Sequence, residues 1–255
     1  MTDRDDLMGR IAAYWDADAA TYDSAHDSGS PCGHRHADAA DRAAWSEALA
    51  RHLPPAPARV LDVGAGTGFL ALTAARLGHE VTALDISARM LERLTAAADR
   101  DGLRITTVNG PADGPPDGPF DVVMERHVLW TLPDPVGALR AWRAAAPGGR
   151  LLAFEGLWGN ADPVEKVRRG MRGAVRRALR RPPGHHAPYP SDVLAALPLA
   201  GVTSPSRVCE VVEAAGWRAP RLQRLRDVEW IRTLALPPAE RALGVVPQYL
   251  VAASA

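Results

Sequence analysis

The segment VLDVGAGTGFL, residues 60–70, constrains the fold more than any other part of the sequence. A short apolar run that contains Asp62 is followed by glycines at 64, 66 and 68. Glycine adopts positive φ and lets another group approach the backbone closely, so glycines between a strand and a helix indicate a ligand resting against the turn. Residues 60–70 therefore predict a strand, a ligand-binding turn and the start of a helix.

The sequence after Arg59 alternates between strand-like and helix-like patterns. Short β-branched runs separated by longer runs with helical periodicity are typical of a parallel sheet with right-handed crossovers. The strand-like runs lie at residues 59–63, 80–85, 103–108, 120–125 and 150–158, with two further candidates near 221–228 and 247–253. The pattern predicts an α/β fold.

Two segments depart from this alternation. Residues 1–58 have helical patterns with polar loops, and residues 160–204 are rich in arginine and proline without strand signals. We expect the first to form an N-terminal helical lid and the second a helical cap insertion. The core is then divided between residues 59–159 and residues 205–255.

The composition limits the class of partner. Lys+Arg and Asp+Glu both total 30, so no global field attracts nucleic acid or an anionic membrane, and a small, roughly neutral molecule is the expected partner. Cys32 and Cys209 cannot form a disulfide framework, and the N-terminus lacks the apolar core of a signal peptide. We expect a cytoplasmic protein, either monomer or homodimer.

The glycine spacing narrows the ligand at the turn. A dinucleotide fingerprint needs a third glycine where Phe69 stands, and a phosphate-binding loop needs a lysine followed by serine or threonine where Phe69 and Leu70 stand. Asp85 closes the second strand, in VTALDIS, where a carboxylate reaches both hydroxyls of a ribose. Its alternative role is to cap the following helix, for which Ser87 competes.

Together, VLDVGAGTGFL, ALDIS, FDVVMERHVLWTLPDP and PGGR resemble the class I S-adenosylmethionine (SAM) methyltransferase family. The resemblance implies a Rossmann-like, doubly wound, mostly parallel sheet of seven strands, with SAM as cofactor and S-adenosylhomocysteine as product. It implies the following cofactor-binding residues: Asp62, Gly64, Ala65, Gly66, Gly68, Asp85, Ile86, Met90, Ala112 and Arg126. For Asp62, hydrogen bonding that orders the glycine loop is favoured over chemistry.

One motif departs from the family. Where many relatives have Gly-Asp-Ala after the third strand, this chain has Gly110-Pro111-Ala112. The adenine would then be held by the backbone of Ala112, by Asp113, or by apolar packing alone.

The acceptor site is expected at the carboxyl ends of the fourth and fifth strands, where parallel α/β sheets bind ligands. His127 is a candidate base, or it supports the turn that follows it. Tyr14, Trp15 and Tyr22 either close over the sulfonium or form the core of the lid. The expected substrate-binding residues are Trp15, Glu125, Trp130, Trp158 and Tyr189, with Glu155 also at this floor.

Residues 1–45 and 160–204 are expected to form the acceptor site together. Within the second segment, VRRGMRGAVRRALRR can place Val167, Met171, Val175 and Leu179 on one stripe, which favours a solvated cap helix over a pocket for an anionic acceptor. His26, Cys32, His34 and His36 lack zinc-site spacing, so no metal is expected.

The sequence therefore predicts a SAM-dependent methyltransferase that acts on the oxygen, nitrogen or carbon of a small molecule. Two alternatives remain. One is an enzyme that cyclises the aminobutyryl group of the cofactor, and the other is a non-catalytic SAM-binding module.

Overall fold

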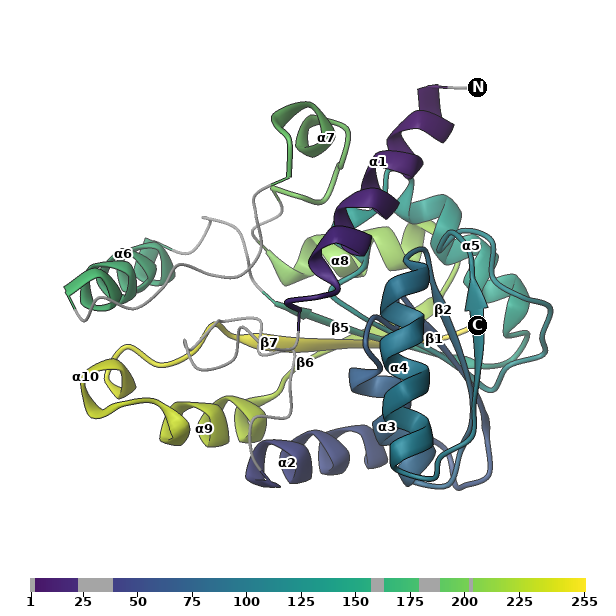
Figure 1. The fold of residues 1–255 in the computed structure, drawn as a ribbon, viewed down its shortest axis with the longest axis horizontal. Coiled ribbons are helices and arrows are strands. Elements are labelled where there is room, and N and C mark those ends of the chain that lie inside the picture. Colours follow the sequence, from purple (N-terminus) through teal and green to yellow (C-terminus); the bar gives the residue numbers. More distant parts are fainter. Residues whose placement is uncertain (1–2, 23–38, 157–162, 179–188, 202–203) are drawn as a thin grey trace.

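A seven-stranded sheet forms the centre of the protein, as described by a computed structural model (Figure 1). The structure describes residues 3–22, 39–156, 163–178, 189–201 and 204–255. The strands are β1 (Arg59–Val63), β2 (Glu80–Asp85), β3 (Ile105–Asn109), β4 (Val122–Arg126), β5 (Arg150–Gly156), β6 (Arg218–Arg224) and β7 (Gln248–Ser254). Their order in the sheet is β3-β2-β1-β4-β5-β7-β6.

The strand directions confirm the expected α/β fold. Strands β1 to β5 pair in parallel, and β7 runs antiparallel between β5 and β6. The helices are α1 (Asp3–Asp18), α2 (Ala39–Ala50), α3 (Phe69–Arg76), α4 (Ala88–Arg100), α5 (Pro135–Ala145), α6 (Pro163–Ala178), α7 (Ser191–Ala195), α8 (Pro205–Ala214), α9 (Arg226–Ala235) and α10 (Pro238–Arg241). Leu129–Thr131 form a single 3₁₀ turn after β4.

Side chains that alternate along the strands build one apolar layer on each face of the sheet. Leu61 and Val63 of β1 pack in a layer covered by α5 and α8, whereas Val60 packs in a layer with α2, α3, α4 and α9. The turn after β1 lies where the chain order reverses between the neighbours β2 and β4. Such a reversal is where open α/β sheets form ligand crevices.

Two sequence-based expectations need correction. The strand candidate at 221–228 ends at Arg224, and α9 begins at Arg226, because Leu225 and Val228 turn into the core one helical turn apart. Trp45, expected near the acceptor, is buried against Phe69 and Phe154 in the sheet core. Thus α2 packs as part of the core, and α1 is the helix of the predicted lid that lies near the crevice.

Among the described residues, no helix combines the length and the apolar character that crossing a membrane requires.

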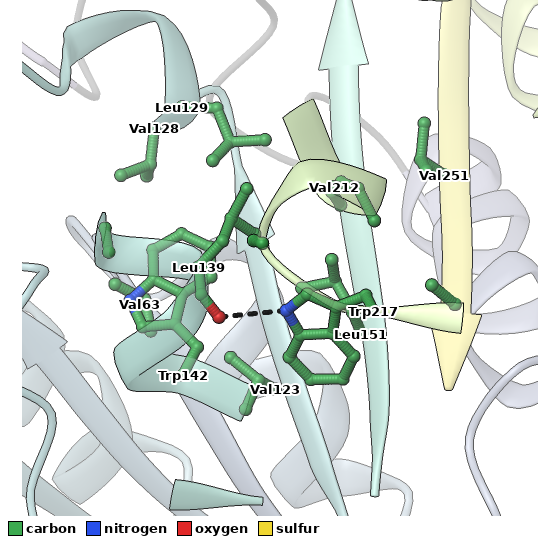
Figure 2. Packing of buried hydrophobic residues seen from close by; sticks show 14 of the residues in the cluster. Val63, Val123, Val128, Leu129, Leu139, Trp142, Leu151, Val212, Trp217 and Val251 are labelled. Carbon is green, nitrogen blue, oxygen red and sulfur yellow. Dashed lines mark hydrogen bonds between the residues drawn. The ribbon is translucent and has the colours of Figure 1, made fainter. Parts of the chain in front are cut away.

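Trp217 ties α8 and β6 to α5. Its indole nitrogen donates to the carbonyl oxygen of Leu139 at 2.9 Å, and its ring lies among Trp142, Val212 and Val251 (Figure 2). The residue is 2% exposed. A buried hydrogen bond and a filled core volume therefore depend on one side chain.

We expect Trp217→Phe to lower the free energy of unfolding by about 1–3 kcal/mol, because it removes the hydrogen bond and leaves a small cavity. Urea denaturation followed by circular dichroism measures the change. Trp230→Phe is the matched control, since Trp230 is 64% exposed. Equal midpoints for the two variants would contradict this account of the packing.

Candidate functional site

A pocket of about 400 Å³ lies at the carboxyl ends of β1, β2 and β4, with α1 along one side. Of the residues predicted from sequence, it brings together Tyr14, Trp15, Tyr22, Gly64, Gly66, Asp85, Ile86, Met90, Ala112, Arg126, His127, Trp130 and Tyr189. These residues are far apart in the sequence, and the sheet and α1 gather them around one space.

The glycine turn forms the floor of the pocket. Gly64 and Gly66 have φ of 63° and 55°, in the left-handed region that glycine tolerates. A Cβ at Gly64 would lie 2.2 Å from Val128, whereas a Cβ at Gly66 would meet no protein atom within 4 Å. Gly64 is therefore required by the protein's own packing, and Gly66 leaves open space that a ligand can enter.

Asp85 holds this turn in place. Its two carboxylate oxygens accept hydrogen bonds from Gly66 N and Ser87 N, each at 2.8 Å. Burial raises the pKa of Asp85 to about 6, and the two backbone N–H groups oppose that shift. The N-cap of α4 is Ser87, whose hydroxyl accepts from Met90 N, so Asp85 does not serve as the helix cap.

Three residues of the predicted cofactor set lie behind the pocket wall. A Cβ at Gly68 would be 2.9 Å from Leu94, so this glycine allows α3 to pack closely against α4. Ala65 is buried in the core layer. Asp62 is also buried, and its burial raises the pKa of its carboxyl group well above the usual range. The structure therefore gives these three residues a supporting position.

The region after β3 bears on how an adenine would be held. The carbonyl oxygen of Ala112 accepts from the indole nitrogen of Trp142 at 2.6 Å, and Asp113 forms an ion pair with Arg4 of α1. Met90 and Ile86 line the pocket beside Ala112. Of the alternatives left open by Pro111, this arrangement favours apolar packing, because the Asp113 carboxylate already binds the lid.

A second contact fastens α1 to the rim of the pocket. Asp16 accepts from the hydroxyl of Ser87 at 2.5 Å and from Arg89 N at 3.3 Å. Sequence reasoning did not assign Asp16 a role, although it lies within residues 1–58, which were expected to form the lid. The lid is thus attached to the same short segment that carries Asp85.

Five aromatic side chains, which we call the aromatic wall, line the pocket together with the glycine turn. They are Tyr14, Trp15, Tyr22, Trp130 and Tyr189. Tyr189 is at the centre: its ring stacks on Tyr14 with centroids 4.1 Å apart and meets Trp130 and Trp15 edge to face at 5.7 and 6.1 Å. Such ring pairs fix the shape of an apolar site.

The expected union of residues 1–45 with residues 160–204 is met only in part. Residues from α1 meet Tyr189 and Leu194 at the pocket, but the described side chains of the basic helix α6 are not part of its lining. The described part of α6 therefore does not form a pocket for an anionic acceptor. Trp158, and the possible metal ligands His26, Cys32, His34 and His36, lie outside the described residues.

The ends of β4 and β5 carry a buried cluster of ionisable groups. Glu125, expected to contact the acceptor, is fully buried and accepts from Val128 N at 2.8 Å, so it does not line the pocket. Nδ1 of His127 lies 3.6 Å from the carboxylate of Glu155. Burial raises the pKa of Glu125 to about 8 and that of Glu155 well above its usual range, and it lowers the pKa of His127.

The surroundings of His127 and Arg126 limit the roles that the two side chains can take in a reaction. The backbone of His127 has φ of 62°, and both ring nitrogens are buried although the residue touches the pocket. This geometry favours support of the turn over proton transfer. Arg126 lies with its guanidinium carbon 3.9 Å from the centre of the Phe69 ring, a cation–π contact that holds the charge at the pocket wall.

Several lining residues were not predicted. They are Met8, Ile11, Leu84, Gly110, Val128, Thr131, Leu132 and Leu194. Val128 and Leu132 directly follow the fourth strand in HVLWTLPDP, so their position after a strand end was the available signal. Met8 and Ile11 are one helical turn apart in α1 and gave no comparable signal.

The family and sequence comparisons with known proteins find methyltransferases. The methyltransferase domain family matches residues 61–153. The ribosomal protein L11 methyltransferase of Thermus thermophilus is 37% identical over 134 residues, 52% of this chain and 50% of that protein. The ubiquinone biosynthesis O-methyltransferase of Xanthomonas axonopodis pv. citri is 36% identical over 110 residues, 41% of this chain and 46% of that protein. The chain thus spans about half the length of the curated relatives it matches.

A solved structure extends the fold comparison over nearly the whole chain. The cyclase SpnF is 20% identical, with 96% of this chain and 95% of that chain covered and a TM-score of 0.62. At this identity the likeness concerns the fold.

The buried carboxyl of Glu125 predicts a pH dependence of folding. Its folded-state pKa of about 8 lies above the ordinary value of 4.5, so the folded protein keeps a proton that the unfolded chain releases. This stabilisation is complete below about pH 4.5 and is lost as the pH rises through about 8. We expect the free energy of unfolding to fall by a few kcal/mol from about pH 5 to about pH 9.

Glu125→Gln tests this expectation, because the amide stays neutral and can still accept from Val128 N. Its stability should decline less with pH, and at about pH 9 it should exceed that of the wild type. Urea midpoints across the pH range measure the slope. Glu213→Gln, at an exposed position on α8, should follow the wild-type slope. Parallel slopes for Glu125→Gln and the wild type would show that Glu125 is ionised in the folded protein.

Proposed function

We propose that this chain is a class I SAM-dependent methyltransferase, because the methyltransferase domain family matches residues 61–153 and the curated relatives it matches are methyltransferases. We propose that it methylates a neutral, largely apolar small molecule that stacks on the aromatic wall. The observation that carries this proposal is that the glycine turn and the aromatic wall line the same pocket.

The residues present fit the cofactor. The open space above Gly66 suits a group that lies directly on the backbone, and the buried carboxylate of Asp85 beside it suits a ribose diol. Ile86 and Met90 offer an apolar surface for the adenine. When bound, SAM supplies an electrophilic methyl group on a positively charged sulfur, for which the faces of Tyr14 and Trp15 are suitable neighbours.

The remaining residues that line the pocket support a neutral acceptor. Among the described lining residues, the ionised side chains are Asp85, which faces the glycine turn, and Arg126, which lies on Phe69. The wall itself presents aromatic rings together with Met8, Ile11 and Leu194. An anionic or strongly polar acceptor would lose its hydration there without gaining an ion pair. A fused-ring or phenolic molecule would keep its contacts.

The chain contributes orientation and exclusion of water. Tyr189 and Trp130 fix the plane of a stacked acceptor, and α1, attached through Asp16, covers the pocket. Holding two reactants in line can supply an effective molarity of about 10⁵ M or more. Because the nitrogens of His127 are buried, we assign it support of the turn and no proton-transfer step.

The two alternative functions differ from methyl transfer in that neither needs a site for an acceptor. A cofactor cyclase or a SAM-binding module would need the glycine floor but would have no use for the aromatic wall beyond it. A direct test incubates the protein with SAM and three acceptor groups: neutral polycyclic phenols, aromatic carboxylates, and bulk tRNA with ribosomal protein. Mass spectrometry follows S-adenosylhomocysteine and the gain of one methyl group. Methylation of the macromolecules alone, or cofactor loss without a methylated product, would overturn the proposal.

We expect Asp85→Ala to weaken SAM binding by about 1.5–3 kcal/mol, since it removes a charged acceptor for the ribose and frees the Gly66 turn. Isothermal titration calorimetry measures the change. Asp101→Ala is the control, because this exposed aspartate at the far end of α4 pairs with Arg76. Unchanged affinity in Asp85→Ala would remove Asp85 from the cofactor site.

We expect Trp130→Ala to lower kcat/KM for a neutral aromatic acceptor by about 10- to 100-fold, because one side of the stacking surface is lost. SAM affinity should stay within about threefold, since Trp130 lies at the acceptor end. Trp230→Ala, at the exposed surface of α9, should match the wild type in both measurements. A loss of SAM affinity equal to the loss of kcat/KM would place the wall in the cofactor site.

A further inference from the structure

Helix α6 turns an apolar stripe towards solvent. Val164, Val167 and Met171 are 56%, 62% and 51% exposed. Their spacing of three and four residues places them on one side of the helix, which is where a globular protein normally buries its apolar residues. Figure 1 shows α6 at the periphery of the molecule, away from the sheet. We call these three residues the α6 stripe.

The polar side of α6, in contrast, contacts the rest of the protein. Arg172 lies about 110° around the helix from the middle of the stripe, at about 100° per residue. It donates to the carbonyl oxygens of Leu243 at 2.9 Å and Gly244 at 3.4 Å. These carbonyls follow α10, the short helix against which α6 packs. The helix is therefore attached through a polar side chain and leaves its apolar side outward, so the stripe is not a misplaced part of the core.

Basic residues far outnumber acidic residues in α6. Residues 163–178 contain six basic residues and a single acidic one, Glu165. Because the whole chain has 30 of each sign, the remaining residues carry an excess of five acidic charges. Lys166, Arg168 and Arg177 are exposed. The balanced totals, which argued against an anionic membrane partner, thus conceal one concentrated patch of positive charge.

The combination of stripe and charge selects among possible partners. A second copy would bring two strongly basic helices together, which costs electrostatic energy. A nucleic acid would satisfy the charges and leave the apolar stripe in water. An anionic bilayer satisfies both, because basic side chains meet the headgroups while apolar side chains enter the boundary with the acyl chains.

We propose that α6 binds the surface of an anionic lipid bilayer and lies in its interfacial plane. The stripe faces the acyl boundary, and the basic residues flank it at the level of the headgroups. This surface is separate from the pocket, since Val164, Val167 and Met171 are not among the residues that line it. Membrane binding can therefore be measured without any knowledge of the acceptor.

The test is flotation of the full chain with vesicles of phosphatidylcholine alone and of phosphatidylcholine with phosphatidylglycerol in equal parts. We expect the partition coefficient on the anionic vesicles at ~0.1 M salt to be at least about tenfold higher, and to fall as salt screens the charges. Equal binding to both vesicle types, or binding to neither, overturns the proposal.

Two variants test whether binding depends on the α6 stripe or on any exposed apolar residue. Val167→Asp combined with Met171→Asp should lower the partition coefficient at least about tenfold, while Leu222→Asp, on the edge strand β6 at 42% exposure, should not. Unchanged SAM affinity in each variant verifies that the fold is intact. Equal losses in the stripe and Leu222 variants would contradict the assignment. So would self-association of the wild type, in sedimentation velocity, that the stripe variant abolishes, or tRNA binding in place of vesicle binding.

Discussion

The carboxylate of Asp85 connects the parts of the site. By accepting from Gly66 N and Ser87 N, it joins the glycine turn after β1 to the first turn of α4. Ser87 in turn caps α4, and its hydroxyl donates to Asp16 of α1. The lid is therefore attached to Ser87, whose backbone N–H donates to Asp85. The buried carboxylate, the turn at Gly66 and the position of α1 are therefore linked by hydrogen bonds, and α1 carries Tyr14 and Trp15 of the aromatic wall.

Much of the fold could be predicted from sequence because the signals were local. The alternation from β1 to β5 and the glycines at a strand end fix topology through backbone preference and periodicity. What each glycine does could not be predicted, since Gly64, Gly66 and Gly68 differ only in what a Cβ would meet: Val128, open space, or Leu94. Likewise α9 and the burial of Trp45 depend on packing between segments distant in sequence, which no local pattern reports.

The aromatic wall and the buried carboxyls show the same limit for the site. Residues of α1 and Tyr189 were expected to cooperate. That Tyr189 stacks on Tyr14, and that the described side chains of α6 do not line the pocket, depends on tertiary placement. Glu125 followed the rule that strand ends face the ligand, yet its carboxylate turns back to Val128 N beneath the pocket. Position along a strand fixes the face of the sheet, and the direction of the last side chain is decided by its neighbours.

The place of β7 in the sheet has a consequence for how the protein is made. Because β7 lies between β5 and β6, the strand β6 has no partner in the sheet when it leaves the ribosome. It must wait, as an unpaired edge, until residues 248–254 are synthesised and inserted beside β5. During that interval the outer edge of β5 is open to other chains in the same state. Insertion of β7 closes this edge by pairing with β5 and β6 at once.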